Sequence, residues 1–201
     1  IYNGEVDIAY IAQLAQKDPG LVSSILKIAN STAYSSSGKA TSDLIVAITR
    51  LGLSTVTQLF VTKSLENLFK DDPPIGFFSL KGFVKHCAWV SQIAFELGKI
   101  LNLTEKNDLL IAGLIHDIGL LAQLYASKEN FVKLVNECAN KKIDFVTAEL
   151  LLQLDSHEQL GEEITTKWQL PENVITIVKY HHTPEAKRAQ TLTVNQNKSI
   201  N

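Results

Sequence analysis

The pattern of apolar and polar positions predicts helices along the whole chain. Near the start, Asp18 is placed to cap a helix whose first position is Pro19, and the apolar residues that follow fall mostly on one stripe. The run LIVAITRLG predicts a second helix, which Gly52 ends, and Ser54 is placed to cap a third. No segment has the pattern expected of a strand, so we expect an all-α fold.

The clearest boundary lies at KDDPPIG, residues 70–76. Two consecutive prolines cannot lie inside a helix, and the two aspartates before them favour solvent. We therefore divide the chain into an N-terminal helical subdomain, residues 1–74, and a second helical subdomain, residues 75–201.

The second subdomain contains two long helical patterns. Residues 80–101 have apolar residues at helical spacing, which are Phe83, Val90, Ile93 and Leu97. His86 lies four residues before Val90 on the same stripe, so we expect His86 to point inward. The stretch LLIAGLIHDIGLLAQL is apolar nearly all round, which predicts one central, buried helix carrying His116 and Asp117. Further helices are expected at 128–141, 144–154, 156–169 and 171–182.

Composition and charge narrow the function classes. The chain has 201 residues, 45% of them hydrophobic and 20% charged, with a net charge of −2, which is ordinary for a globular protein. Residues 1–78 carry 6 basic and 7 acidic side chains and the remainder 13 and 14, so neither part has the basic excess of a nucleic-acid surface. We expect no DNA partner.

Cysteine usage and hydropathy indicate the compartment. Cys87 and Cys138 lie outside any CxxC pairing, which argues against a disulfide framework or a thiolate zinc site and fits a reducing cytoplasm. No uninterrupted apolar run approaches the roughly 20 residues that span a bilayer, and IYNGEVDIAY lacks the features of a signal peptide. The sequence predicts a cytoplasmic protein without a membrane partner.

The candidate chemistry lies in the histidines. Imidazole and carboxylate are ligands that borderline transition metals prefer. Asp117 is the strongest single candidate, because an ionised carboxylate in an apolar helix must be paired, hydrogen-bonded, protonated or bound to metal, and no basic residue lies within a turn of it. The candidate ligands are His86, His116, Asp117, His157, His181 and His182.

Each histidine alone has a plainer interpretation. His86 could be a core histidine bonded to a backbone carbonyl, and His157, after Ser156, a solvated or capping residue. His181 and His182 suit a helix C-terminus without any metal. Neighbours on a helix point about 100° apart, so His116 and Asp117 cannot both be simple ligands of one ion unless it lies between them or the carboxylate bridges two ions. A two-metal site would suit hydrolysis of a phosphate ester.

Several motifs in order resemble the HDOD domain, an output-type relative of the HD phosphohydrolase superfamily found in bacterial signalling proteins. The resemblance covers roughly residues 5–188. It implies an N-terminal helical bundle packed on an HD-like helical core, and a module that regulates by binding proteins or small signals. The motifs are DPGLVSSILKIANSTAY, AITRLG, KHCAWVSQIA, IAGLIHDIGLL and HEQLGEEITTKWQLPENVITIVKYHHTPEAK.

The resemblance also implies a metal site with departures from the related enzymes. The six candidate residues stand where cyclic-di-GMP phosphodiesterases of the HD-GYP type place their ligands. The resemblance therefore makes a divalent Fe, Mn, Zn or Mg ion a candidate cofactor without assigning one. Those enzymes follow the HD pair with glycine and lysine, whereas Gly119 is followed here by Leu120. TPEAKRAQ replaces the GYP loop, and no aspartate follows Asp155 to supply the last ligand.

We therefore predict a non-catalytic signalling module with a partly retained metal site, and assign no catalytic residue. The alternative is a metal-dependent phosphohydrolase or phosphodiesterase of nucleotides or cyclic dinucleotides. A third possibility is a sensor that holds a small molecule in the crevice between the two subdomains. Histidine kinases, response regulators and diguanylate cyclases are the partners that the resemblance implies.

Overall fold

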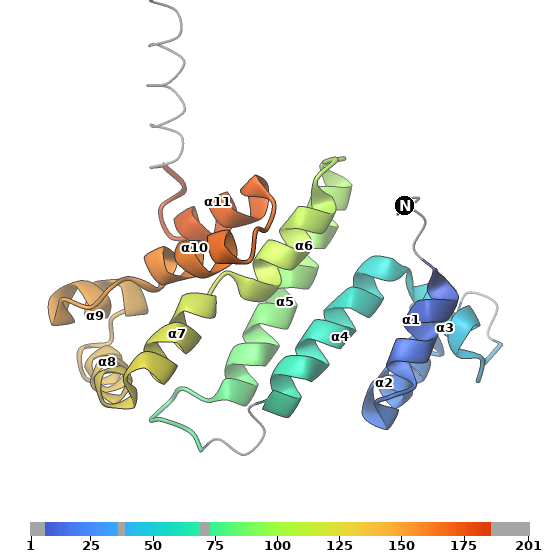
Figure 1. Cartoon of the computed structure of the whole chain (residues 1–201), viewed down its shortest axis with the longest axis horizontal. Helices are drawn as coiled ribbons and strands as arrows, with labels where there is room; N and C mark the ends of the chain where they lie inside the picture. Colours follow the sequence, from blue (N-terminus) through green and yellow to red (C-terminus); the bar gives the residue numbers. More distant parts are fainter. Residues whose placement is uncertain (1–6, 36–38, 69–72, 186–201) are drawn as a thin grey trace, which may run out of the picture. The chain divides into compact units, whose positions relative to one another are not determined.

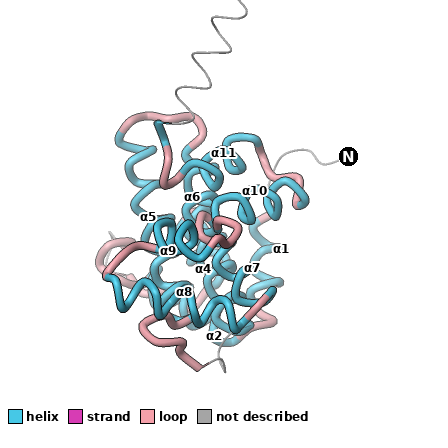
Figure 2. The backbone as a smooth tube through the Cα atoms, turned by 90° about the vertical axis from the view of Figure 1, so that its left-hand side faces the viewer, coloured by secondary structure: helices cyan, strands magenta, loops and turns pink. Residues whose placement is uncertain are grey.

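The structure, a computed structural model, describes residues 7–35, 39–68 and 73–185. Within these ranges the backbone forms eleven α-helices and no strand (Figures 1 and 2), which confirms the expected all-α fold. The only strand-like pairing among the described residues is an isolated bridge between Ile75 and Phe78. The chain divides into two compact units, Ile1–Lys70 and Asp71–Asn201. The boundary between them along the chain lies within the 70–76 segment. Each unit is described by itself.

The first unit packs four helices around small and branched apolar side chains. Asp18 accepts hydrogen bonds from the backbone N–H groups of Gly20 and Leu21, as expected of an N-cap. Ser54 does not cap the last helix of the unit, because that helix begins at Leu53, directly after Gly52. The helices are α1 (Ile8–Ala15), α2 (Pro19–Ala29), α3 (Leu44–Leu51) and α4 (Leu53–Leu68).

The second unit contains the other seven helices and all the candidate ligands. Helix α5 lies beside α6, α7 packs on α8 and α10, and α11 packs on α6 and α10. Helix α9 follows α8 and lies against it (Figure 1). The bounds are α5 (Leu80–Ile100), α6 (Lys106–Ile115), α7 (Ile118–Ala126), α8 (Lys128–Lys141), α9 (Phe145–Leu152), α10 (His157–Lys167) and α11 (Glu172–Tyr180).

The apolar stretch predicted as one helix is two helices, α6 and α7. Asp117 has ψ 14°, away from the helical value of about −42°, and no helix includes His116 or Asp117. The Nδ1 atom of His116 lies 3.0 Å from the carbonyl oxygen of Gly113, the acceptor that the N–H of Asp117 would use in a continuing helix. The side chain therefore competes with the backbone there and favours the break.

The α6–α7 segment also resembles a membrane span in length and composition. Lys106–Ala126 is long and apolar enough to cross a bilayer, as is the bent pair Leu44–Leu51 and Leu53–Ser64. However, 56% of the most apolar 18-residue stretch in Lys106–Ala126 is buried inside the protein, and the mostly buried core helix of a soluble protein has the same length and composition. Length and composition alone therefore do not identify this segment as a membrane span.

Helix α5 buries only the first part of the predicted apolar stripe. Phe83 is buried as expected, but Ile93 and Leu97 are 56% and 51% exposed, whereas Cys87 and Ser91 are fully buried. The reason is the close packing of α6, because a Cβ added to Gly113 would lie 2.6 Å from the Cα of Ser91. Small residues therefore occupy the contact face, and the expectation that His86 shares a buried apolar stripe is wrong.

Gly119 allows α7 to approach the start of α10. A Cβ at this position would lie 1.9 Å from the carbonyl oxygen of His157, so Gly119→Ala must push the two helices apart. We expect a loss of about 1–3 kcal/mol in the free energy of unfolding. Urea unfolding measures this loss. Gly20→Ala is the control, because its Cβ would meet only side-chain atoms of Asp18 and Lys63, at 3.1 Å or more. Equal stability of the two variants would contradict the prediction.

Candidate metal centre

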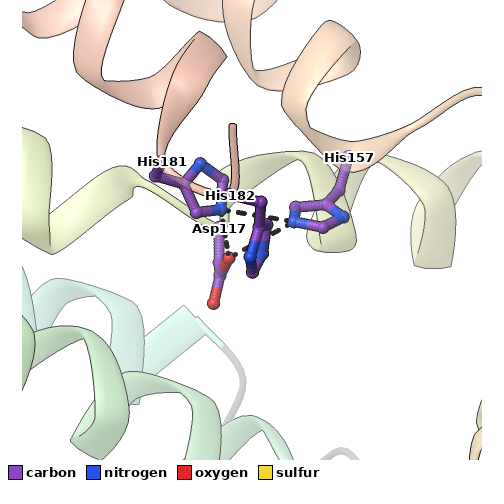
Figure 3. Close-up of side chains that lie close together, drawn as sticks. All are labelled: Asp117, His157, His181 and His182. Atoms are coloured by element: carbon purple, nitrogen blue, oxygen red, sulfur yellow. Dashed lines mark hydrogen bonds and ion pairs between the residues drawn. The ribbon is translucent and has the colours of Figure 1, made fainter. Parts of the chain in front are cut away.

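The six candidate ligands come from four separate segments of the second unit. His86 lies within α5, His116 and Asp117 form the α6–α7 junction, and His157 is the first residue of α10. His181 and His182 follow the end of α11. The structure brings them together in two groups that share Asp117: the His86 group of His86, His116 and Asp117, and the His157 group of Asp117, His157, His181 and His182 (Figure 3).

The two oxygens of Asp117 face different groups. Its Oδ2 lies 3.0 Å from Nε2 of His116 and 3.5 Å from Nε2 of His86. Its Oδ1 lies 3.2 Å from Nε2 of His181 and 3.6 Å from Nε2 of His157. Nε2 of His116 is 3.2 Å from Nε2 of His86, and the corresponding atoms of His157 and His181 are 3.3 Å apart. One carboxylate thus lies between two sets of imidazoles.

The far nitrogens of three rings have fixed acceptors. Nδ1 of His116 faces the carbonyl oxygen of Gly113, and Nδ1 of His181 lies 2.8 Å from the carbonyl oxygen of Val178. Nδ1 of His157 lies 2.8 Å and 3.0 Å from the two oxygens of another carboxylate. Because these oxygens can only accept, Nδ1 carries the proton in each neutral ring, and the lone pair of Nε2 points at the cluster.

The cluster therefore needs positive charge at its centre. In the neutral rings of His116, His157 and His181 the Nε2 lone pairs face the Asp117 carboxylate, and those of His157 and His181 also face each other. Such an arrangement is favourable only when a ring takes up a second proton and donates it from Nε2 to Asp117, or when a metal cation lies between these atoms. Imidazole nitrogens with one carboxylate suit Zn, Fe and Mn ions in particular. The donor set fits a divalent metal, and the position of the carboxylate fits two.

The electrostatics of the metal-free cluster are dominated by Asp117. Burial raises the pKa of its carboxyl, but the hydrogen bonds from His116 and His181 outweigh burial and hold that pKa well below its usual range. Burial lowers the pKa of His181, yet its contacts with Asp117 raise it overall. For His182, burial and the neighbouring His181 lower the pKa. The carboxylate is therefore ionised at neutral pH and available as a ligand.

Glu149 is a residue that the sequence analysis did not identify. It lies in α9 and is 1% exposed. Its Oε1 accepts hydrogen bonds from the backbone N–H of His157 at 3.2 Å and from Nε2 of Gln123 at 2.8 Å, in addition to the contact with the His157 ring. The argument used for Asp117 would have found it, because Glu149 is the only acid in the apolar run FVTAELLLQL.

The non-metal roles considered for the histidines agree with the structure for some residues and not for others. The side chain of His86 is 54% exposed, but its Nε2 still lies at the cluster. His157 is fully buried and follows the N-cap Ser156, so it is neither solvated nor the cap itself. His182 is exposed, and its backbone N–H donates to Glu158 at 3.2 Å.

The two cysteines are not part of the cluster. Cys87 and Cys138 are buried, free thiols. Burial, together with the negative charge of Asp117, raises the pKa of Cys87 to about 12, so this thiol is protonated at neutral pH in the metal-free protein.

The fold and the cluster define an all-helical protein in which histidines from four separate segments surround one aspartate. The chain belongs to the HDOD domain family, whose family model matches residues 1–184. This confirms the resemblance drawn from the motifs. The chain is also 26% identical over 193 residues to an uncharacterized protein of Treponema pallidum. The aligned region covers 90% of this chain and 35% of that protein.

Three solved structures are similar to this chain. An HDOD domain protein of unknown function from Geobacter sulfurreducens is 27% identical, with a TM-score of 0.73 over 92% of this chain and 61% of its own. A candidate signal transduction protein from Marinobacter aquaeolei is 22% identical, with a TM-score of 0.66 over 90% and 41%. A candidate metal-dependent phosphohydrolase from Shewanella amazonensis is 18% identical, with a TM-score of 0.53 over 89% and 62%. The chain thus spans between about a third and three fifths of its relatives.

Proposed function

We propose that this chain is a signal-transduction module of the HDOD family that holds one or two divalent metal ions and acts by binding rather than by turnover. The observation that best supports metal binding is the convergence of four imidazole Nε2 atoms on the two oxygens of Asp117. A bound ion would supply positive charge and open coordination positions at the cluster. The signalling role rests on the family. The name of the Marinobacter relative points the same way, although its 22% identity supports the fold alone.

One feature supports binding over turnover. Leu120 is 3% exposed and stands where related enzymes are expected to have a lysine, so this position offers no cation to a phosphate. The absence of that cation weakens the stabilisation of charge in a phosphoryl transition state more than it weakens metal binding.

The second candidate is a metal-dependent phosphohydrolase of nucleotides or cyclic dinucleotides. The position of Asp117 between the two groups favours it, because a bridging carboxylate suits the paired ions that hold attacking and leaving oxygens. The name of the Shewanella relative points the same way, although its 18% identity supports the fold alone.

Metal analysis and a hydrolysis assay on the same preparation separate the two candidates. We expect protein purified without chelator, or loaded with Mn²⁺, to hold one or two ions per chain. We expect it to cleave bis(4-nitrophenyl) phosphate no faster than Asp117→Asn does. Hydrolysis that is lost in Asp117→Asn would establish the enzyme instead, and a metal content of zero would refute the metal centre.

The partners follow from the signalling proposal. A cytoplasmic histidine kinase, response regulator or diguanylate cyclase would bind the module, and DNA would not. Co-purification of such a protein with the wild-type chain but not with variants in the 18–34 segment would support this. Loss of the partner in His116→Ala instead would place the contact at the cluster.

A further inference from the structure

A cavity of about 330 Å³ opens beside the His86 group, within the second unit. Its lining includes two members of that group, His86 and Asp117. The other walls are largely apolar: Phe77, Phe78, Phe83, Phe145 and Leu120. This volume is near the lower end of the range for small-molecule sites, which are mostly apolar with a few polar groups that orient the ligand.

The charges around the cavity select its ligand. Among the described residues, no lysine or arginine lines the cavity, so the cavity itself offers an anion no cationic side chain. A divalent ion at the His86 group would supply that positive charge, because two neutral imidazoles and one carboxylate leave a net positive centre. An oxyanion therefore binds only to the metal-loaded protein.

The His86 group is also incomplete as a coordination shell. It offers three ligand atoms, whereas the His157 group offers four. Sites with three protein ligands keep a position open for water or a ligand. Since His86 and Asp117 both line the cavity, the open position of their group is accessible from it.

The apolar walls favour an oxyanion that also carries a flat, apolar group. Phe77 is 59% exposed, and its ring lies 6.0 Å from that of Phe145, tilted by 47°. A planar group that enters the cavity can cover the exposed ring. Ser79 also lines the cavity; its hydroxyl accepts from the N–H of Gly82 and keeps its own O–H to donate. Apart from His86 and Asp117, this hydroxyl is the one polar side-chain group that the described lining offers to the edge of a ring.

We infer that this cavity binds an organic oxyanion with a flat, apolar body, its oxyanion on the metal of the His86 group and its body against Phe77. The inference rests on the metal centre proposed above and names the ligand class of that centre. It also predicts selection for a ring without strong selection for the hydrogen-bonding pattern of the ring.

Phenylphosphonate and methylphosphonate, which share the oxyanion and differ in the ring, test the inference. Metal content is measured first on the full chain, and binding then by calorimetry. With Mn²⁺ bound, we expect phenylphosphonate to bind about tenfold more tightly than methylphosphonate. Without metal we expect neither to bind. Equal affinities in the loaded protein, or phenylphosphonate binding without metal, would overturn the inference while leaving the metal centre intact.

Phe77→Ala tests whether Phe77 forms the wall against which the ring binds. Because Phe77 is 59% exposed, we expect this variant to fold. We expect it to weaken phenylphosphonate binding about fivefold and to leave both methylphosphonate binding and metal content unchanged. Trp168→Ala is the matched control, because Trp168 is 56% exposed and lies outside the cavity lining. An unchanged preference for the ring in Phe77→Ala would contradict the assignment of the wall. A metal-free preparation that cannot be loaded would refute the metal centre and the inference together.

Discussion

Replacing Asp117 with asparagine is expected to weaken metal binding at both groups by more than about 100-fold. Its two oxygens face separate sets of imidazoles, so a neutral amide removes the only carboxylate from both. Equilibrium dialysis against Mn²⁺ followed by metal analysis measures the loss. The side chains have the same shape, so the change in charge is isolated from a change in packing.

Asp108→Asn is the control for this experiment. Asp108 lies in the first turn of α6, where it accepts a hydrogen bond from Asn173 at 3.1 Å, and it is not a member of either group. We expect its metal content to equal that of the wild type. If Asp117→Asn retained one of two ions at full affinity, Asp117 would belong to a single group and would not bridge.

Replacing Glu149 with alanine is expected to lower the free energy of unfolding by about 3–5 kcal/mol. The change leaves two buried donors on His157 without their acceptor, and it removes one of the two acceptors of the half-buried Gln123 amide. It also frees the tautomer of His157, so we expect metal affinity to fall by about 10–100-fold. Urea unfolding and Mn²⁺ titration measure the two effects separately.

Glu149→Gln separates orientation from packing. The amide oxygen can still accept from His157, so we expect this variant to recover part of the metal affinity lost in Glu149→Ala. Glu163→Ala is the surface control, because its only described ion pair is with Lys167 at 3.9 Å, and a change within about 0.5 kcal/mol is expected. Full metal affinity in Glu149→Ala would show that Glu149 stabilises the fold without orienting the ligand.

The sequence was sufficient for features that depend on local chemistry. The N-cap at Asp18 and the bounds of α8 follow from residues adjacent in the chain, and the structure confirms both. Asp117 could be singled out because a charge in an apolar segment requires a partner wherever the chain folds. The position of the partners, however, depends on four segments that pack only in the tertiary structure.

Other features depended on packing that periodicity does not encode. The buried face of α5 carries Cys87 and Ser91 because Gly113 permits close contact, and an apolar-stripe analysis favours Ile93 and Leu97 instead. The break between α6 and α7 depends on one side-chain contact of His116. These are the places where tertiary contacts override local pattern.

The spacing of the candidate ligands along the chain has a consequence for folding. The segments run from His86 to His182, so the cluster exists only once α5, α7, α10 and α11 have all docked. An ion bound there acts as a cross-link that closes long loops, and at a free concentration 100 times its dissociation constant it would add about 2.7 kcal/mol to stability. The resistance of the second unit to unfolding would then rise and fall with the free metal concentration around it.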